Sequence, residues 1–294
     1  MSKPEPKSSP LDWLIDRILR GLLRLALALP YERRVAFIGW MVADVLAPLT
    51  GYKSRAIANL KMVYPDLSAT ELKARARAVC NNVGRTIIEN YSTEEFAKRA
   101  RAIPLQGPGL DALKEARAQG RPVLFVTAHF ANYEAPRHAL DAAGISVAGV
   151  FRAMSNAYFH EHYMETLLSV SGPMFEQGSG GARKMVVHLK RGGCVAIGFD
   201  LYFPSGALIP FMGHPAKTAL SSAEVGVKLE ALVIPYFAMR KDNGLDFDVI
   251  IDAPIPHAAP EEMLLEMNKR LEAMIAQKPD QWFWTHRRWK GIVR

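Results

Sequence analysis

The pattern of apolar and polar residues changes near Pro122. Before it, apolar residues recur at helical spacing from about residue 11 to residue 117, and no strand pattern is found. After it, short apolar or β-branched runs alternate with helical stretches, the order typical of parallel strands connected by helices. Because the runs are continuously apolar, both faces of the strands should be covered. They lie at 123–129, 145–151, 194–200, 231–237 and 245–252.

The sequence therefore predicts an α/β protein with a mostly parallel central sheet flanked by helices, preceded by a helical N-terminal region. Three parts are expected. Residues 1–10 form a polar, proline-rich tail that should be disordered. Residues 11–117 form the helical region, and residues 118–294 form the α/β core. No internal repeat and no long linker separates the two larger parts.

The most apolar part of the N-terminal region is residues 11–30, which carry aspartates and arginines at helical spacing. Ionised groups are costly in hydrocarbon, so a helix here should lie in a membrane interface with its arginines toward anionic lipid rather than cross the bilayer. A second apolar run, 35–49, is short and contains Asp44. The alternative is that both helices cover the protein's own core. The apolar stripe of the first helix consists of Trp13, Leu14, Ile18, Leu22 and Leu25.

Composition and charge exclude several classes of protein and indicate an anionic partner. With 49% hydrophobic and 22% charged residues, the chain is neither disordered nor fibrous. Cys80 and Cys194 lie outside any CxxC, which argues against a disulfide scaffold or a thiolate zinc site and fits a reducing cytosol. The net charge of +8 indicates an anionic partner, which could be nucleic acid, phospholipid headgroups or an acidic carrier protein.

The segment AHFANYE contains the strongest candidate for chemistry. His129 ends a strand pattern, and Glu134 follows five residues later in the first turn of a helix that Asn132 could cap. The carboxyl edge of parallel strands is where open α/β sheets bind ligands. An imidazole held by a carboxylate can remove a proton from an alcohol. From these residues alone, His129 could also be a hydrogen-bonded core residue and Glu134 a charge favoured by the helix dipole.

A series of sequence blocks surrounds this segment and continues to the C-terminal region. They are VLFVTAHFANYE, FRAMSN, LKRGGCVAIGFD, IPFMGHPAKTALS, ALVIPYFAMR and QWFWTHRRWK. These blocks resemble, in family order, the bacterial lipid A biosynthesis acyltransferases of the lauroyl and myristoyl transferase type. An upstream block, RAIANLKMVYPDLS at 55–68, resembles the same family, so the resemblance extends over nearly the whole chain from about residue 11.

The resemblance implies a lysophospholipid-acyltransferase-like fold attached to the cytoplasmic face of the inner membrane, as a peripheral or monotopic protein. It implies transfer of a fatty acyl chain from an acyl carrier protein thioester to a hydroxyl of a lipid A precursor. His129 would then be the general base and Glu134 its orienting partner. Arg152 is the leading candidate for stabilising the oxyanion, because it follows the strand at 145–151 and should emerge at the same sheet edge. This chemistry needs no cofactor and no metal.

The resemblance also marks residues expected to bind substrate. Asn132 belongs to the motif, and Asp200 ends a strand, where it could pair with Arg152 or position the acceptor. A loop expected to close over the acyl chain or thioester contains Phe211, Gly213 and Thr218.

The C-terminal block is expected to meet the lipid. Its basic residues would supply cations for phosphates, and its tryptophans would supply rings for the membrane interface. The basic residues are His286, Arg287, Arg288 and Lys290, and the tryptophans are Trp282, Trp284 and Trp289.

Two departures from the family pattern leave the substrates open. Leu201 follows Asp200 where the family commonly has Gln, and residues 163–172 lack an Arg often found there. The acceptor could therefore be a lysophospholipid or an amino lipid, and the donor could be acyl-CoA. A contrasting hypothesis is a non-catalytic basic protein that binds anionic membrane or nucleic acid. It leaves the HFANYE segment unexplained, and a nucleic-acid partner is not favoured because no nucleic-acid-binding signature accompanies the charge.

Overall fold

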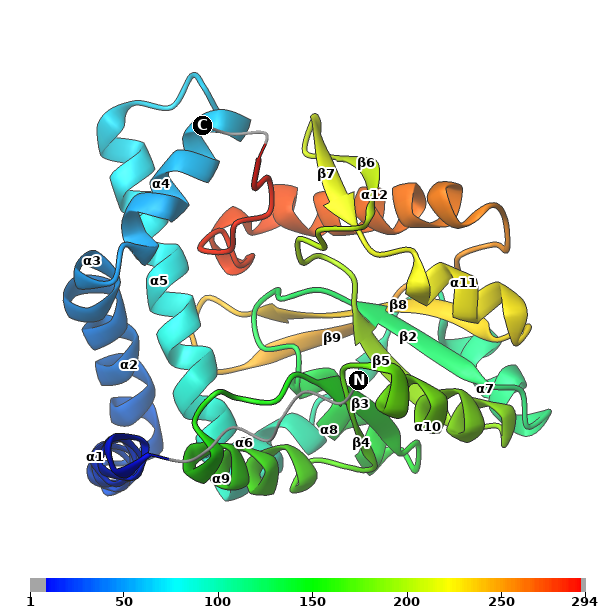
Figure 1. The fold of residues 1–294 in the computed structure, drawn as a ribbon, viewed down its shortest axis with the longest axis horizontal. Coiled ribbons are helices and arrows are strands. Elements are labelled where there is room, and N and C mark those ends of the chain that lie inside the picture. The colour runs from blue at the N-terminus through cyan, green and yellow to red at the C-terminus, as the bar shows by residue number, and fades with distance from the viewer. Residues whose placement is uncertain (1–8, 292–294) are drawn as a thin grey trace.

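The computed structural model describes residues 9–291 and contains a seven-stranded sheet with helices on both faces (Figure 1). The strand order is β1-β9-β8-β2-β5-β3-β4. Strands β8, β2, β5, β3 and β4 are parallel, β9 is antiparallel to β8, and β1 is parallel to β9. The predicted mostly parallel α/β sheet is confirmed. Its strands are β1 (Leu105–Gln106), β2 (Val123–Thr127), β3 (Val147–Phe151), β4 (Met174–Glu176), β5 (Cys194–Gly198), β8 (Leu232–Arg240) and β9 (Phe247–Ile251).

Alternate residues of the central strand face two different layers of helices. Leu124 and Val126 pack in a core with residues of α10, α11 and α12, whereas Val123 and Phe125 pack with residues of α7 and α8. Both faces of β2 are therefore buried, as the continuously apolar run requires. These helices are α7 (Leu110–Ala118), α8 (Ala135–Ala142), α10 (Ser179–Lys190), α11 (Ser221–Lys228) and α12 (Pro260–Gln277).

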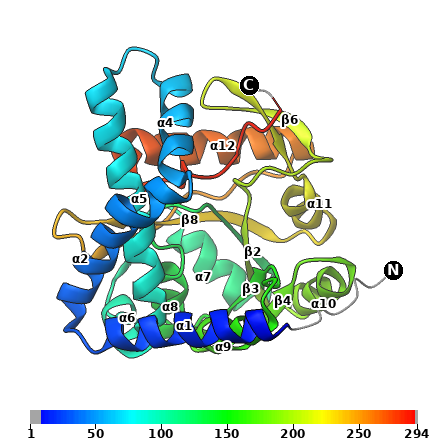
Figure 2. The same cartoon turned by 60° about the vertical axis from the view of Figure 1, so that its left-hand side comes forward.

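The N-terminal helices pack beside the sheet around the long helix α5 (Ala69–Tyr91), which contacts both α2 and α4 (Figure 2). α5 begins with a capping box, in which Ser68 Oγ accepts from the Glu71 N–H and the Glu71 carboxylate accepts from the Ser68 N–H. The other elements of this region are α1 (Pro10–Leu27), α2 (Tyr31–Met41), η1 (Val42–Leu46), α3 (Ala47–Leu49), α4 (Tyr52–Val63) and α6 (Thr93–Arg101).

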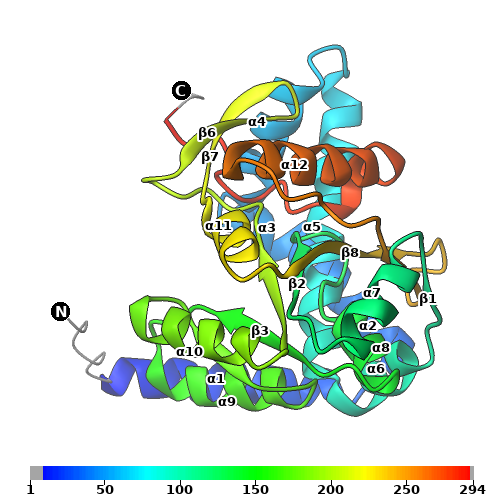
Figure 3. The same ribbon diagram turned by 90° about the vertical axis from the view of Figure 1, so that its right-hand side faces the viewer.

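Helix α1 keeps its apolar stripe on the surface. Ile18 is 53% exposed and Leu25 is 71% exposed, and the only buried residues of the helix are Asp16 and Ala26. The polar side of α1 lies along α9 (Ala157–Leu168), as Figure 3 shows, and Arg20 Nη2 donates to the Tyr158 carbonyl at 2.8 Å. The alternative in which this stripe covers the protein's own core is therefore wrong for α1.

Among residues 9–291, no single helix has both the length and the apolar composition to cross a membrane. Tyr31–Leu49 and Tyr52–Val63 pass that test only as a pair, and they are bent by 89° relative to each other.

Three local predictions differ from the structure. β1 precedes Pro122, where no strand was expected, and it pairs with β9 over only two residues. The segment 207–218, expected as a loop, is a two-stranded hairpin of β6 (Ala207–Phe211) and β7 (His214–Thr218). Of the tail predicted at 1–10, residues 1–8 lie outside the described residues, while Ser9 and Pro10 begin α1.

Candidate active site

The register of two neighbouring parallel strands brings His129 and Asp200 together. Thr127 of β2 pairs with Gly198 of β5, and each site residue lies two positions beyond its strand. The His129 Nδ1 atom is 2.9 Å from Asp200 Oδ1, and the His129 main-chain N–H donates to Asp200 Oδ2 at 2.9 Å. Asp200 therefore fixes both the ring and the backbone of His129.

Asp200 is 2% exposed, yet its environment favours the ionised carboxylate. Trp282 Nε1 adds a third donor at 2.9 Å from Oδ2. Burial raises the pKa of this carboxyl, but attraction to His129 and the hydrogen bonds from His129 and Trp282 outweigh it and lower the pKa to about 2. Asp200 is thus a carboxylate at neutral pH.

The His129 ring presents its second nitrogen away from this carboxylate. Because an ionised carboxylate only accepts, Nδ1 carries the hydrogen and Nε2 has a free lone pair when the ring is neutral. The side chain is 30% exposed, and its ring packs against Tyr133 and Phe283 at centroid distances of 5.1 and 5.8 Å. Burial lowers the pKa of His129, but the charge and hydrogen bond of Asp200 outweigh this and raise it above the ordinary value.

Phe283 also lines a cleft of about 410 Å³ whose ionisable lining is basic. Arg152 lies in this cleft directly after β3, at the edge of the sheet where the sequence places it. None of the described residues that line the cleft is acidic, so the site attracts anions. The lining residues are Tyr52, Arg55, Arg152, Tyr202, Pro204, Phe283, Thr285, His286, Arg287 and Lys290.

Arg55 is a cleft residue that sequence reasoning did not single out. Its Nη1 donates to the Thr285 carbonyl at 3.0 Å, and Asn59, one turn later on α4, donates to the carbonyls of Trp284 and His286 at 2.7 and 2.8 Å. These contacts explain the RAIANLK block, because its Arg and Asn hold the C-terminal segment against α4. The resemblance marks the RAIANLK block, but it does not identify the C-terminal segment that this block contacts.

Glu134, which was expected to hold His129, instead forms an ion pair with Arg137. Arg137 Nη1 donates to Glu134 Oε2 at 2.6 Å, and Arg137 also donates to the carbonyls of Val147 and Ser171. Both side chains of this ion pair are buried. The carboxylate that contacts the ring is therefore that of Asp200 and not that of Glu134. The partners of Asp200 among the described residues are His129 and Trp282, and no ion pair joins it to Arg152. The charge of Glu134 still contributes to the raised pKa of His129.

Asn132 is buried and its side chain is fully engaged. Its Nδ2 donates to Glu89 Oε2 at 3.0 Å and to Asn90 Oδ1 at 2.9 Å, and its Oδ1 accepts from the Glu134 N–H at 3.0 Å. This last bond lies just before α8, which begins at Ala135. Asn132 thus shapes the loop and is not placed to bind substrate.

Three more of the predicted binding residues, Thr218, Phe211 and Arg288, are buried where the hairpin β6–β7 packs against the C-terminal segment. Arg288 is buried and donates to Thr218 Oγ1 at 2.6 Å. Phe211 is also buried, and Gly213 occupies the exposed hairpin turn with φ +76°. The three tryptophans expected at a membrane interface are at most 2% exposed. Trp282 and Trp289 pack against Phe211, and Trp284 packs against Trp282.

His286 lies in the cleft as expected, but not as a cation. Its Nε2 accepts from the Tyr202 N–H at 2.9 Å. Burial lowers the pKa of His286 to about 4, so the ring is neutral at physiological pH. Arg287 and Lys290, both exposed, carry the charge of this segment into the cleft.

Within residues 9–291, no cluster of three or more His, Cys, Asp or Glu side chains could hold a metal ion. A carboxylate-held imidazole with a free nitrogen is instead the arrangement of a general base. The fold and the site thus define an α/β protein with a His–Asp pair at the carboxyl edge of its sheet.

Comparison with known proteins supplies the family. The chain belongs to the bacterial lipid A biosynthesis acyltransferases, whose family profile matches residues 3–291, and it is an acyltransferase. It is similar to the lipid A biosynthesis lauroyltransferase of Escherichia coli K12, with 25% identity over 92% of this chain and 89% of the relative. The palmitoleoyltransferase of the same organism gives the same identity and coverage. Lipid A biosynthesis acyltransferase 2 of Shigella flexneri is 22% identical over 79% of this chain and 76% of the relative.

Proposed function

We propose that the protein transfers a fatty acyl chain from a thioester donor to a hydroxyl of a lipid A precursor at the cytoplasmic face of the inner membrane. The family membership and the names of the relatives support the reaction class and the acceptor. The observation that carries the mechanism is the His129–Asp200 pair, with Nε2 of the ring free beside a cationic cleft.

His129 acts as the general base. Nε2 takes the proton of the acceptor hydroxyl while that oxygen attacks the thioester carbonyl, and the carbonyl becomes a tetrahedral oxyanion. The oxyanion then collapses, the C–S bond breaks, and the imidazolium returns its proton to the leaving thiolate. The products are an ester and a free thiol. Asp200 keeps Nδ1 protonated and stabilises the imidazolium formed in between.

The cationic side chains of the cleft stabilise two kinds of negative charge, the oxyanion that forms during the reaction and the phosphate groups of the substrates. Arg152 is the side chain proposed to face the oxyanion, because it lies at the same sheet edge as His129 and is exposed in the cleft. Arg55, Arg287 and Lys290 provide fixed positive charge for phosphate groups of the acceptor or donor. A carrier-protein thioester and acyl-CoA are both anionic donors that suit such a cleft.

Glu134 acts as a positioning residue rather than as the orienting partner of the ring. Its carboxylate is buried against Arg137, which in turn ties α8 to the carbonyls of Val147 and Ser171. This ion pair fixes the segment that follows His129, and the Glu134 carboxylate contributes to the raised pKa of the ring.

Helix α1 carries the proposed membrane contact. Its exposed leucines, isoleucines and Trp13 would enter the headgroup region, while exposed Arg17 and Arg24 meet anionic lipid. The acceptor and the enzyme would then share one surface.

The test is a panel of donors and acceptors with products read by mass spectrometry. Acyl carrier protein and acyl-CoA donors are each combined with a lipid A precursor, a lysophospholipid or an amino lipid. Wild type is expected to acylate the lipid A precursor, and His129→Ala to fail. His257→Gln, which alters an exposed histidine outside the cleft, is the matched control.

Each outcome of the panel decides one point. Acylation of only a lysophospholipid or an amino lipid would reject the proposed acceptor and keep the mechanism. Full activity of His129→Ala would reject the mechanism. No product from any combination, together with tight binding to anionic vesicles, would favour a non-catalytic membrane protein.

A further inference from the structure

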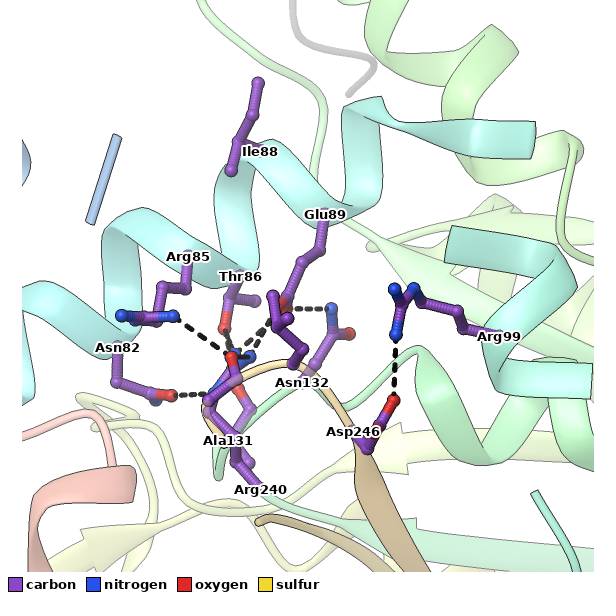
Figure 4. Close-up of polar contacts among 12 residues, drawn as sticks. Asn82, Arg85, Thr86, Ile88, Glu89, Arg99, Ala131, Asn132, Arg240 and Asp246 are labelled. Carbon is purple, nitrogen blue, oxygen red and sulfur yellow. Dashed lines mark hydrogen bonds and ion pairs between the residues drawn. The ribbon is translucent and has the colours of Figure 1, made fainter. Parts of the chain in front are cut away.

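A second buried ion pair lies behind the candidate active site (Figure 4). Arg240, the last residue of β8, forms a two-bond pair with Glu89 of α5, in which Nη2 is 2.9 Å from Oε2 and Nη1 bonds to Oε1. Glu89 is fully buried and the Arg240 side chain is 6% exposed. Arg240 Nε also donates to Asn82 Oδ1 at 2.8 Å. A buried pair is costly to maintain, so its contacts indicate what it holds in place.

The Glu89 side of this pair holds the loop that carries His129. Glu89 Oε2 accepts from Asn132 Nδ2 at 3.0 Å, and Thr86 Oγ1, one turn earlier on α5, donates to the Ala131 carbonyl at 2.9 Å. Ala131 has φ +46°, a left-handed conformation that non-glycine residues adopt rarely and that needs support from its surroundings. α5 therefore fixes the backbone two and three residues after His129.

The main chain of Arg240 holds the segment that supports Asp200. The Arg240 N–H donates to Gln281 Oε1 at 2.8 Å, and Gln281 Nε2 donates to the Arg240 carbonyl at 2.9 Å. The Gln281 carbonyl accepts from the Ala131 N–H at 2.8 Å. The next residue, Trp282, donates to Asp200. Arg240 is thus linked through Glu89 to the loop that carries His129 and bonds directly to Gln281, the neighbour of the residue that supports Asp200.

We infer that Arg240, paired with Glu89, is a positioning residue that sets the alignment of His129 with Asp200. The inference rests on the proposed function, because the alignment of His129 with Asp200 matters for turnover only if His129 is the general base. Arg240 does not line the cleft. Its side chain acts through Glu89 and Asn132 on one side, and on the other through Asn82, whose Nδ2 donates to the Gln281 carbonyl at 3.3 Å. Its removal should loosen the ring–carboxylate contact and reduce turnover without removing a binding group.

The central test replaces both charges by similarly sized apolar side chains, in Glu89→Met/Arg240→Met. This variant leaves no unpaired buried charge and does not change the net charge. Turnover, kcat, should fall by about ten- to a hundredfold, because small misplacements of a catalytic group are costly, while KM stays within about twofold. The acid limb of the kcat–pH profile should also move to lower pH, because a looser Asp200 contact raises the pKa of His129 less.

Two further variants keep the test decisive if the double variant fails to fold. Thr86→Val removes only the hydroxyl donor to Ala131 and should lower kcat by about threefold with KM unchanged. The matched control is Arg34→Met, because the Arg34 side chain has the same 6% exposure. It bonds to Glu95, Ser92 and the Leu29 carbonyl, none of which bonds to the loop that carries His129. The control variant should lower the melting temperature and leave kcat and its pH profile as in wild type.

The outcomes separate this inference from the proposed function. If His129→Ala is inactive but the Glu89/Arg240 and Thr86 variants turn over as wild type with an unshifted acid limb, the positioning role is rejected and the proposed function stands. If Arg34→Met changes kcat as strongly as the double variant, the effect is one of general stability and the inference also fails. If His129→Ala is active, the proposed function fails first.

Discussion

The buried region behind His129 and the open cleft beside it both contain charged side chains, but the two regions hold these side chains in different ways. Behind His129, the charged groups Asp200, Glu89 and Arg240 are buried and each is held by several hydrogen bonds. In the cleft, Arg152 and Arg287 are exposed. Buried charged side chains that are fully hydrogen-bonded keep one conformation in the folded protein. Exposed long side chains remain flexible and can adapt to a ligand.

This difference assigns separate tasks to the two regions. Under the proposed function, positioning of the base would depend on buried atoms that do not line the cleft, and recognition of substrate would depend on cleft side chains that have few partners in the protein. Substitutions in the buried region should therefore change kcat, and substitutions in the cleft or on α1 should change binding, with Arg152 as the residue that joins the two. The following predictions test this division, from the largest expected effect to the smallest.

Replacing His129 by Ala should lower kcat by about a thousandfold, because the substitution removes the imidazole that is proposed to take the hydroxyl proton. The measurement is single-turnover acyl transfer, with circular dichroism to verify the fold. Residual activity above a tenth of the wild-type value would show that the buried region does not supply the base.

Replacing Asp200 by Asn should lower kcat by about a hundredfold or more, because the ring loses its fixed tautomer and its countercharge. Asp200 raises the pKa of His129, and a base works only when neutral, so wild-type activity should rise with pH through a value above that of an ordinary histidine. In Asp200→Asn only the weaker attraction of Glu134 still opposes the effect of burial, so the pKa of the ring falls and the acid limb moves to lower pH. A limb that stays in place would contradict the pairing.

Replacing Arg152 by Ala should lower kcat by about ten- to a hundredfold and change the KM for the acceptor less, because the charge it meets develops in the transition state. Arg183→Ala, an exposed arginine of α10 outside the cleft, is the control. An effect confined to KM would place Arg152 with the substrate-binding cations and not with the reacting carbonyl.

Replacing Ile18 and Leu22 together by Glu should reduce binding to vesicles containing phosphatidylglycerol by about tenfold or more, since each apolar side chain contributes about 1.5–3 kcal/mol when it leaves water. Activity on detergent-dispersed acceptor should not change. Val187→Glu, at 43% exposure on α10, is a matched control against 53% and 58% for the two α1 residues. Equal vesicle binding of both variants would remove α1 from the membrane contact.

The sequence predicted the sheet well because parallel strands covered on both faces leave a direct signature of continuous apolar runs. It also placed His129, Arg152 and Asp200 at strand ends. It did not predict which of them meet, because chain order is β2, β3, β5 whereas the order in the sheet is β2-β5-β3. The neighbour of His129 is therefore Asp200, contributed by a strand distant in sequence, and not the nearby Glu134.

Two other misplacements have identifiable physical causes. The hairpin β6–β7 was missed because Pro210 and Pro215, which face each other across it, are depleted in strands and hid its pattern. The C-terminal tryptophans were assigned to a membrane interface because aromatic and basic residues alternate there. The hairpin instead packs against them, and Arg288 Nη2 donates to Thr218 Oγ1.

The matched register of β2 and β5 restricts how this chain can vary in length. Thr127 lies opposite Gly198, and the reacting pair extends equally far beyond both. An insertion or deletion between Gly198 and Asp200 would therefore carry the carboxylate out of reach of the imidazole, whatever residues were retained. The exposed turn at Gly213 is under no such restriction, so divergence in length should accumulate at the hairpin tip and be absent from these two short connections.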